Sequence, residues 1–175
     1  MPPFVVKTVD GRTWRLAERT PPNFTLIIVY RGLHCPICKG YLADLERRLP
    51  DLEERGVEVI AVSSDDEART RQAKADWGLK TLTLGYGLNL ATARRWGLYV
   101  SAGIGGTSSG IEEPPLFVEP GLFLVRRDGT LYFAGVQTMP FARPHFADVV
   151  KAIDFVLAKD YPARGEVVDL AEAAE

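Results

Sequence analysis

Both cysteines of the chain, Cys35 and Cys38, lie in one short stretch, YRGLHCPICKGYL, residues 30–42. Two cysteines with this C-x-x-C spacing can form a redox-active pair, half of a metal site or a structural disulfide. The stretch follows an apolar run, residues 24–30, that is typical of a strand buried on both faces. It opens a helix that we expect over residues 36–49. The three alternatives differ in what the rest of the chain must supply.

The expected start of this helix favours a thiolate at Cys35. Pro36 suits the first helical position, where a missing N–H costs no hydrogen bond, and this places Cys35 at the N-cap. The Cys35 sulfur would then lie among free backbone N–H groups at the positive end of the helix, which stabilise the nucleophilic thiolate. The flanking side chains of Arg31, His34 and Lys39 are expected to favour the same charge state.

Helical periodicity predicts a different environment for Cys38. Cys38, Leu42, Leu45 and Leu49 follow one face of the helix, which must pack against the sheet. Cys38 is therefore expected to be shielded, whereas Cys35, one turn earlier, should remain at the exposed tip. Cys35 would then be the attacking thiolate and Cys38 the resolving thiol that closes an internal disulfide.

Two other interpretations of the pair remain open from the residues alone. Zinc usually takes four ligands, whereas the chain has no second C-x-x-C and only two histidines, His34 and His145. A closed zinc site would need ligands from a partner chain, so no metal site is predicted, and His145 is expected to be a surface or capping residue. Two inert buried cysteines would be the simplest use of this residue type, but the spacing at a strand-to-helix turn favours redox chemistry.

Composition limits the broader function. The 175 residues are 46% hydrophobic and 25% charged, with a formal net charge of −2, which is typical of a globular domain. Lys and Arg do not cluster, so neither nucleic acid nor a membrane surface is an expected partner. The sequence has no signal-peptide pattern at its start and no run of about 18 apolar residues, so we expect a cytoplasmic protein, where structural disulfides are rare.

The segments around the pair predict parallel strands joined by helices. Residues 4–16, FVVKTVDGRTWRL, are typical of a β-hairpin. Residues 57–64 form a second buried strand, and Ser64 with Glu67 has the capping-box spacing that would open a helix running to about Trp77. A right-handed crossover should bring the two buried strands side by side.

The second half of the chain predicts antiparallel strands and a closing helix. Asn89 is expected to start a short helix, and residues 101–115 to form a Gly- and Ser-rich loop that could act as a flap near the site or as an oligomer contact. The stretch GLFLVRRDGTLYFAGV predicts two strands joined across Asp128-Gly129. An apolar stripe in RPHFADVVKAIDFVLAK predicts a final helix with Pro144 in its first turn.

Together these elements predict the α/β fold class, with a mixed central sheet, helices on both faces and an N-terminal β-hairpin extension. Residues 1–165 are expected to form a single domain. Residues 166–175 are expected to form an acidic C-terminal tail.

Over most of its length the sequence resembles thioredoxin-fold proteins of the peroxiredoxin-like branch of the alkyl hydroperoxide reductase / thiol-specific antioxidant family. The resemblance is most specific in VYRGLHCPICKGYLADL, VEVIAVSSDD and EPGLFLVRRDGTLYF. It implies a thioredoxin-like fold and an antioxidant oxidoreductase that uses Cys35 and Cys38 to reduce disulfides or peroxides. It also implies a cis peptide bond between Glu119 and Pro120, with Pro120 facing the sulfurs.

The chain departs from the family pattern around the first cysteine. Ile28 and Gly32 stand where typical peroxiredoxins have a proline and a hydroxyl residue, and His34 and Ile37 stand where family members often have aromatic residues. Peroxide reduction therefore has less support from the residues than dithiol–disulfide exchange. The family also implies an arginine that completes a peroxide pocket, for which the candidates are Arg31, Arg94, Arg95 and Arg126.

The expected partners follow from this chemistry. The substrate would be a disulfide or a peroxide, and an external thiol reductant of the thioredoxin or glutathione type would restore the dithiol. No cofactor is expected, because the chain shows no flavin or nicotinamide fingerprint. A homodimer is a further expectation. The alternative function on the same fold is a non-catalytic redox sensor or a zinc-binding module.

Overall fold

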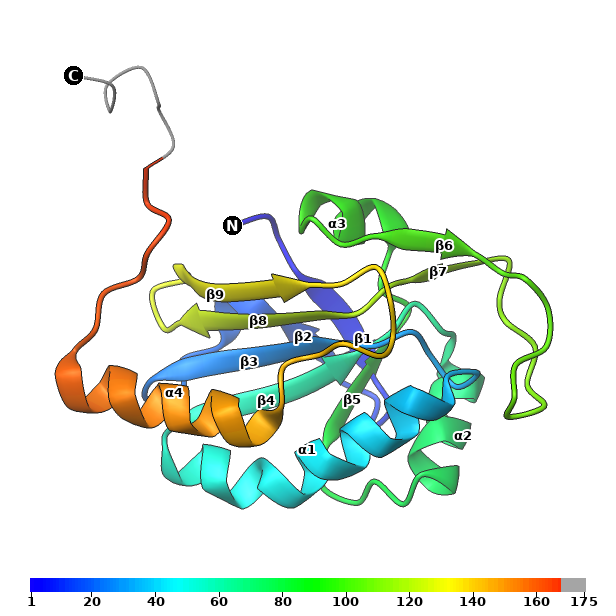
Figure 1. Ribbon diagram of the computed structural model, residues 1–175, viewed down its shortest axis with the longest axis horizontal. Coiled ribbons are helices and arrows are strands. Elements are labelled where there is room, and N and C mark those ends of the chain that lie inside the picture. Colours follow the sequence, from blue (N-terminus) through cyan, green and yellow to red (C-terminus); the bar gives the residue numbers. More distant parts are fainter. Residues whose placement is uncertain (168–175) are drawn as a thin grey trace.

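A computed structural model of the chain describes residues 1–167, so most of the predicted acidic tail, residues 168–175, lies outside the described residues. The described part contains a seven-stranded mixed sheet with helices on both faces and a small two-stranded sheet beside it (Figure 1). The predicted fold class is confirmed. None of the helices within residues 1–167 is long and apolar enough to cross a membrane.

The strands and helices alternate along much of the chain. The large sheet contains β1 (Val5–Thr8), β2 (Thr13–Arg15), β3 (Phe24–Val29), β4 (Val57–Val62), β5 (Thr83–Tyr86), β8 (Gly121–Arg126) and β9 (Leu131–Val136). The small sheet pairs β6 (Val100–Ala102) with β7 (Leu116–Val118). The helices are α1 (Pro36–Glu54), α2 (Glu67–Asp76), α3 (Leu90–Arg95) and α4 (Phe146–Lys159), and a 3₁₀ turn, η1, covers Leu16–Glu18.

The large sheet has the strand order β2-β1-β5-β4-β3-β8-β9. β3 is parallel to β4 and antiparallel to β8, with Ile27 opposite both Ile60 and Phe123. The parallel pair and both predicted hairpins are therefore confirmed. β5, which extends the parallel part, was not predicted, because it is short and contains Gly85. That glycine is required by packing, since a Cβ there would lie 2.9 Å from Val6 Cγ2.

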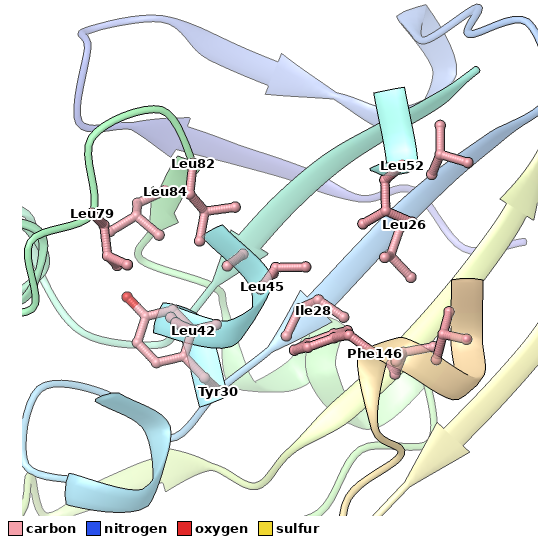
Figure 2. Close-up of a cluster of buried hydrophobic side chains, with 14 of the residues drawn as sticks. Leu26, Ile28, Tyr30, Leu42, Leu45, Leu52, Leu79, Leu82, Leu84 and Phe146 are labelled. Atoms are coloured by element: carbon pink, nitrogen blue, oxygen red, sulfur yellow. The ribbon is translucent and has the colours of Figure 1, made fainter. Parts of the chain in front are cut away.

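The alternation of side chains along β3 builds two cores, one on each face of the sheet. Leu26 and Ile28 belong to the cluster that α1 and α4 cover, with Phe146 of α4 among its members (Figure 2). Ile27 and Val29 point to the opposite face and belong to a second cluster. All six residues of β3 are buried, as expected for a strand covered on both faces. The end of this strand is consequently rigid, and the cysteine segment follows it directly.

Helix α1 begins at Pro36, as predicted, but continues to Glu54 instead of ending at residue 49. Pro50 lies inside the helix, where it removes one backbone donor. Leu52, within the last turn, is fully buried in the core under α1. This burial explains why the helix continues beyond the proline, because ending at residue 49 would withdraw Leu52 from the core.

The starts of the other helices differ in part from prediction. The prediction of a capping box formed by Ser64 and Glu67 is wrong. Helix α2 is capped by Asp66, whose carboxylate accepts a hydrogen bond from Arg69 N at 2.8 Å. Ser64 Oγ instead accepts from Val118 N, at 3.2 Å, so it connects β4 to β7. Asn89 caps α3 as predicted.

The first turn of α4 does not contain Pro144, contrary to prediction. The helix begins at Phe146, with exposed His145 at the N-cap position. The Pro144 carbonyl, just outside the helix, accepts a hydrogen bond from Tyr41 Oη at 2.8 Å. This contact joins α1 to the segment before α4.

The packing of α1 on the sheet should limit the stability of the whole domain. We expect Leu42→Ala to lower the free energy of unfolding by about 2–5 kcal/mol, because Leu42 is fully buried and its loss leaves a cavity. Urea denaturation followed by circular dichroism would measure the change. Lys39→Ala, on the exposed side of the same helix, is the matched control and should change stability by no more than about 0.5 kcal/mol. Equal losses in the two variants would contradict the assigned packing of α1.

Candidate active site

The two cysteines follow a tight turn at the carboxyl end of β3. Residues 31–35, here called the thiol turn, connect β3 to α1. Leu33 N donates a hydrogen bond to the buried carboxylate of Asp65 at 2.7 Å. Gly32 has a φ of +133°, and a Cβ on it would lie 2.5 Å from Asp65 Oδ2. Glycine is therefore required where typical family members have a hydroxyl residue, because Asp65 occupies the space of a side chain.

The predicted N-cap position of Cys35 is confirmed. Cys35 has extended backbone angles ahead of Pro36, and its sulfur accepts a hydrogen bond from Cys38 N at 3.2 Å. Sulfur thus takes the place that an oxygen has in an ordinary N-cap. The helix start directs a backbone N–H at the atom that would carry the negative charge.

The two sulfurs lie side by side at the start of α1. Cys38 Sγ donates to Cys35 Sγ at a separation of 2.6 Å, and both cysteines are free thiols. Cys38 is fully buried, as its position on the packed face of α1 predicted. A disulfide requires the sulfurs to approach to about 2.05 Å, so the pair can close with little movement of the backbone.

Arg143 completes the environment of the sulfurs and was not predicted. Its Nη2 lies 3.2 Å from Cys38 Sγ and 3.9 Å from Cys35 Sγ. The guanidinium lies over the Tyr41 ring, 5.0 Å from its centroid, and Nε donates to the Pro140 carbonyl at 2.9 Å. These contacts hold a positive charge against the sulfurs from the segment between β9 and α4.

Three of the four arginines proposed from the sequence make contacts elsewhere. Arg94 donates to the Leu98 carbonyl, and Arg126 lies over the Tyr132 ring. Arg95 donates to Thr92 Oγ1. The arginine that contacts both sulfurs is Arg143, which was not among the four candidates. Arg143 is more than 100 positions from the cysteines, and its position in an irregular segment before the last helix carries no periodic signal.

The neighbouring groups shift the pKa values of the two cysteines in opposite directions, so that Cys35 is a thiolate while Cys38 remains a thiol. The Cys38 thiol that donates to Cys35 is the largest influence, and it lowers the pKa of Cys35 from an ordinary value of 9.0 to about 6 against the opposing effect of burial. Cys38 N and the charges of Arg143 and Arg31 act in the same direction. Burial, followed by the hydrogen bond to Cys35 and the negative charge of Cys35, raises the pKa of Cys38. At neutral pH the pair therefore contains one thiolate, on Cys35.

His34 does not contribute the positive charge that was expected of it. The side chain is fully buried, and burial together with the charge of Arg31 lowers its pKa to about 4. Its ring packs against Phe117, with centroids 4.7 Å apart, and Nε2 lies 3.9 Å from Glu113 Oε1. His34 is consequently neutral near pH 7, because removal from water disfavours its charged form.

Arg31 is close to the site, but its charge is shared with two buried carboxylates. Arg31 Nη2 lies 3.1 Å from Glu113 Oε1, and Nε lies 3.3 Å from Glu119 Oε2. Arg31 also packs over the Phe117 ring, 4.6 Å from its centroid. It still lowers the pKa of Cys35, but less than Arg143 does. The third flanking group, Lys39, is exposed on α1.

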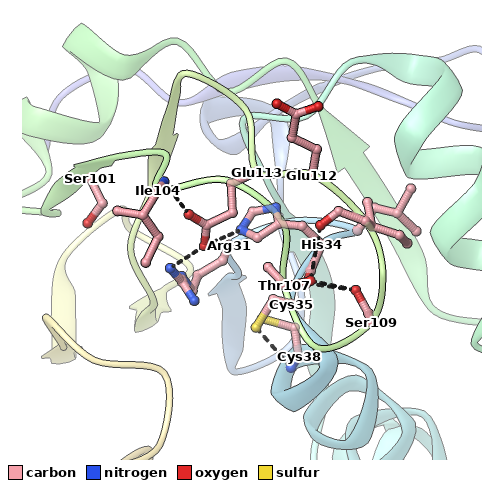
Figure 3. A network of polar contacts seen from close by, with 12 residues as sticks. Arg31, His34, Cys35, Cys38, Ser101, Ile104, Thr107, Ser109, Glu112 and Glu113 are labelled. Atoms are coloured by element: carbon pink, nitrogen blue, oxygen red, sulfur yellow. Dashed lines mark hydrogen bonds and ion pairs between the residues drawn. The ribbon is translucent and has the colours of Figure 1, made fainter.

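The expected exposure of Cys35 is wrong. Only 1% of Cys35 is accessible, although the neighbouring Ile37 is 41% exposed. Residues 103–114, here called the cover loop, lie over the thiol turn (Figure 3). Thr107 Oγ1 and Ser109 Oγ donate to the carbonyl of His34, at 2.8 and 3.2 Å. Helical spacing alone could not reveal this, because the covering segment comes from a distant part of the chain.

The cis peptide bond expected before Pro120 is also wrong, since every peptide bond within residues 1–167 is trans. Pro120 lies where it was expected in the fold, between β7 and β8, and the next residue, Gly121, is opposite Val29 at the end of β3. Glu119 N donates to the Tyr99 carbonyl at 2.8 Å, which continues the small sheet up to the proline. An extended trans connection satisfies this pairing and is also the intrinsically favoured isomer.

Among the residues that the structure describes, no group of three or more His, Cys, Asp and Glu side chains is arranged to hold a metal ion.

Several solved structures have a similar fold. Peroxiredoxin 6 of Arenicola marina, solved as a mutant, superposes with a TM-score of 0.70 at 18% identity, covering 91% of this chain and 73% of that one. The mitochondrial 2-Cys peroxiredoxin of Plasmodium falciparum gives a TM-score of 0.70 at 17% identity, covering 95% and 96%. Enterococcus faecalis AhpC gives 0.68 at 18%, covering 93% and 94%. At these identities the likeness establishes the fold.

Sequence comparisons identify the family. The thiol-disulfide oxidoreductase ResA of Halalkalibacterium halodurans is 28% identical over 92 residues. The match covers 51% of each chain, so this chain spans about half the length of that curated relative. The model of the AhpC/TSA family matches residues 1–134, which include both cysteines, the thiol turn and the cover loop. The chain therefore belongs to the AhpC/TSA family, and a thiol-disulfide oxidoreductase is among its relatives.

Proposed function

We propose that the chain is a thiol-dependent oxidoreductase in which Cys35 is the nucleophile and Cys38 the resolving thiol. One observation carries this proposal: the two sulfurs lie 2.6 Å apart, and their shared hydrogen bond lowers the pKa of Cys35 to about 6 and raises that of Cys38. One sulfur is thereby ready to attack, while the other remains protonated. The substrate class is a peroxide or a disulfide, in a reducing compartment such as the cytoplasm.

In the first step, the Cys35 thiolate attacks one atom of a weak bond. With a peroxide, it attacks an oxygen, the O–O bond breaks, and Cys35 becomes a sulfenic acid while the other oxygen leaves as alkoxide or hydroxide and takes up a proton. With a disulfide, the attack forms a mixed disulfide and expels one substrate thiolate. With a peroxide the Cys35 sulfur loses two electrons in this step, whereas with a disulfide the two-electron reduction of the substrate is complete only when its second thiolate leaves in the next step. Arg143, close to both sulfurs, would stabilise the negative charge as it moves.

In the second step, Cys38 attacks the Cys35 sulfur. An S–S bond forms between them, and water leaves from the sulfenic acid or the second thiolate leaves from the mixed disulfide. Oxidation of Cys35 removes its negative charge and its acceptor role, two of the causes that raise the pKa of Cys38. Arg143, 3.2 Å away, continues to lower it. These contacts support the proposed order of the two nucleophiles, because Cys38 would become easier to ionise only after Cys35 has reacted.

An external thiol reductant must complete the cycle. The oxidised pair needs two electrons and two protons to return to the reduced form, and two thiols of a thioredoxin- or glutathione-type donor would supply them and become a disulfide.

Replacing either cysteine should separate the two roles. We expect Cys35→Ser to abolish peroxide consumption and insulin reduction, both assayed with a thiol reductant. Cys38→Ser should retain the first step and accumulate a sulfenic acid or a mixed disulfide, which intact-protein mass spectrometry would detect. Full activity of the Cys35→Ser protein would rule out the proposed nucleophile.

The pH dependence of alkylation should report the thiolate. We expect the rate of Cys35 alkylation by iodoacetamide to rise with pH around a midpoint of about 6 and to level off above pH 7, because only the thiolate reacts and its pKa is lowered. The same chain unfolded in urea is the control, and its midpoint should return toward the ordinary thiol value of 9.0. A folded-state midpoint at the unfolded value would refute the assignment.

Removing the charge of Arg143 should raise the pKa of Cys35. We expect Arg143→Met to shift the midpoint of alkylation upward, which lowers the rate at pH 6 and leaves the rate at pH 9 nearly unchanged, while Arg143→Lys keeps most of the effect. Arg126→Met is the matched control, since Arg126 packs over a tyrosine ring in the same way, but over Tyr132. If the two Met variants behave alike, Arg143 has no specific role.

A further inference from the structure

We propose that the cover loop, residues 103–114, selects oxidants by size. In its closed position it would admit molecules of the size of a hydroperoxide to Cys35 and exclude protein disulfides, which require the tip of the loop to open. The inference rests on the proposed role of Cys35 as the nucleophile and narrows the substrate class of that site.

Burial of the sulfur is the first observation. Cys35 is 1% exposed and Cys38 is fully buried, although the pair belongs to the first turn of a surface helix. Thiol–disulfide exchange requires a disulfide sulfur to touch the thiolate while its two polypeptide substituents remain outside. A hydroperoxide presents two oxygen atoms and needs a much smaller opening. The closed loop therefore opposes the larger substrate more strongly.

Hydroxyl groups at the tip of the loop form the first fastening. Thr107 Oγ1 and Ser109 Oγ both donate to the carbonyl of His34, the residue immediately before Cys35 (Figure 3). The tip keeps its own shape, because Thr107 N donates to the Ile111 carbonyl and Gly110 N to the Thr107 carbonyl. It can therefore lift as a unit once the two bonds to the thiol turn are broken.

Arg69 of α2 forms the second fastening. Its Nε donates to Asp65 Oδ1 at 3.0 Å, and its Nη2 donates to the Glu112 carbonyl in the cover loop at 3.2 Å. Asp65 is the same carboxylate that accepts from Leu33 N in the thiol turn. The Arg69 guanidinium thus connects the cover loop to Asp65, the carboxylate that holds the thiol turn. Lysine, with one compact ammonium, could keep the ion pair with Asp65 but not the second bond in the same geometry.

The base of the loop is held by stronger interactions than the tip. Glu113 is buried and ion-paired with Arg31, and its other oxygen accepts from Ile104 N at 2.9 Å. Breaking this pair would leave charge buried without a partner, which is costly. The tip is held by a few hydrogen bonds between neutral groups and by Arg69, each of which corresponds to about a two- to tenfold change in an equilibrium. Opening at the tip is therefore the easier movement.

The test compares two maleimides on the Cys38→Ser protein, so that only Cys35 reacts. N-ethylmaleimide is the small probe, and a maleimide on a long polyethylene glycol chain is the large one. We expect Thr107→Val and Arg69→Lys each to raise the ratio of the large-probe rate to the small-probe rate by about two- to tenfold, because each removes a bond from the tip. The ratio cancels any change in the pKa of Cys35.

Control variants distinguish opening of the cover loop from a general loss of structure. Arg71→Lys, on the exposed surface of α2 where Arg71 pairs with Glu67, should leave the ratio unchanged. Ser109→Ala, a change at the exposed end of the loop, is the alternative variant if Thr107→Val fails to fold. An unchanged ratio in both the Arg69 variant and the loop variant would overturn the proposal.

The same experiment distinguishes failure of the inference from failure of the proposed function. Alkylation needs only a thiolate, so the ratio tests the cover even if the protein turns over neither peroxide nor insulin. With Cys38 present, Arg69→Lys should raise insulin reduction relative to peroxide consumption. Turnover with no change in this preference would contradict the size filter and leave the roles of the two cysteines intact.

Discussion

A negative charge on a buried sulfur is the constraint on which the rest of this structure depends. Burial by itself would keep the Cys35 thiol protonated, and the opposing groups must therefore be placed within a few ångströms of it. Cys38 supplies two of them, its thiol and its backbone N–H, because both cysteines belong to the first turn of one helix. Arg143 supplies the third from a distant segment. The stabilisation of the thiolate is thus partly local and partly tertiary.

The sheet holds the cysteine segment in place and so maintains the short distances around the Cys35 sulfur. β3 is covered on both faces, so its end cannot shift without disturbing two cores. The thiol turn that follows is held at Leu33 by Asp65, which comes just after β4, the parallel neighbour of β3. Placing side chains at adjacent strand ends is a general property of parallel sheets, whose functional residues collect at the carboxyl edge. Here it connects the position of the nucleophile directly to the pairing of the strands.

A second polar layer lies above the sulfurs and is almost self-contained. Arg31 pairs with Glu113 and Glu119, and His34 remains neutral among them. Arg31 contacts these carboxylates and not the sulfurs, and it affects the pKa of Cys35 less than Arg143 does. This layer mainly holds the base of the cover loop. Arg143 therefore lowers the pKa of Cys35 by direct contact with the sulfurs, whereas Arg31 mainly holds the base of the cover loop through Glu113.

Local features of the sequence were sufficient to predict the elements that bear the cysteines. The apolar run of β3, Pro36 after Cys35 and the periodic leucines of α1 predicted an N-cap sulfur and a shielded Cys38, because turn and helix chemistry act over a few neighbouring residues. The resemblance extended this to the thioredoxin-like sheet.

Tertiary structure alone decided the surroundings of the nucleophile. Cys35 is buried although its place at the helix start predicted exposure, burial neutralises His34, and the arginine that contacts the sulfurs is Arg143, which was not among the four named from the sequence. The bond before Pro120 is likewise trans and lies next to a strand pairing between distant segments. Each of these features depends on contacts between segments far apart in the chain, and neither spacing nor residue type records which distant side chain will fill a given space.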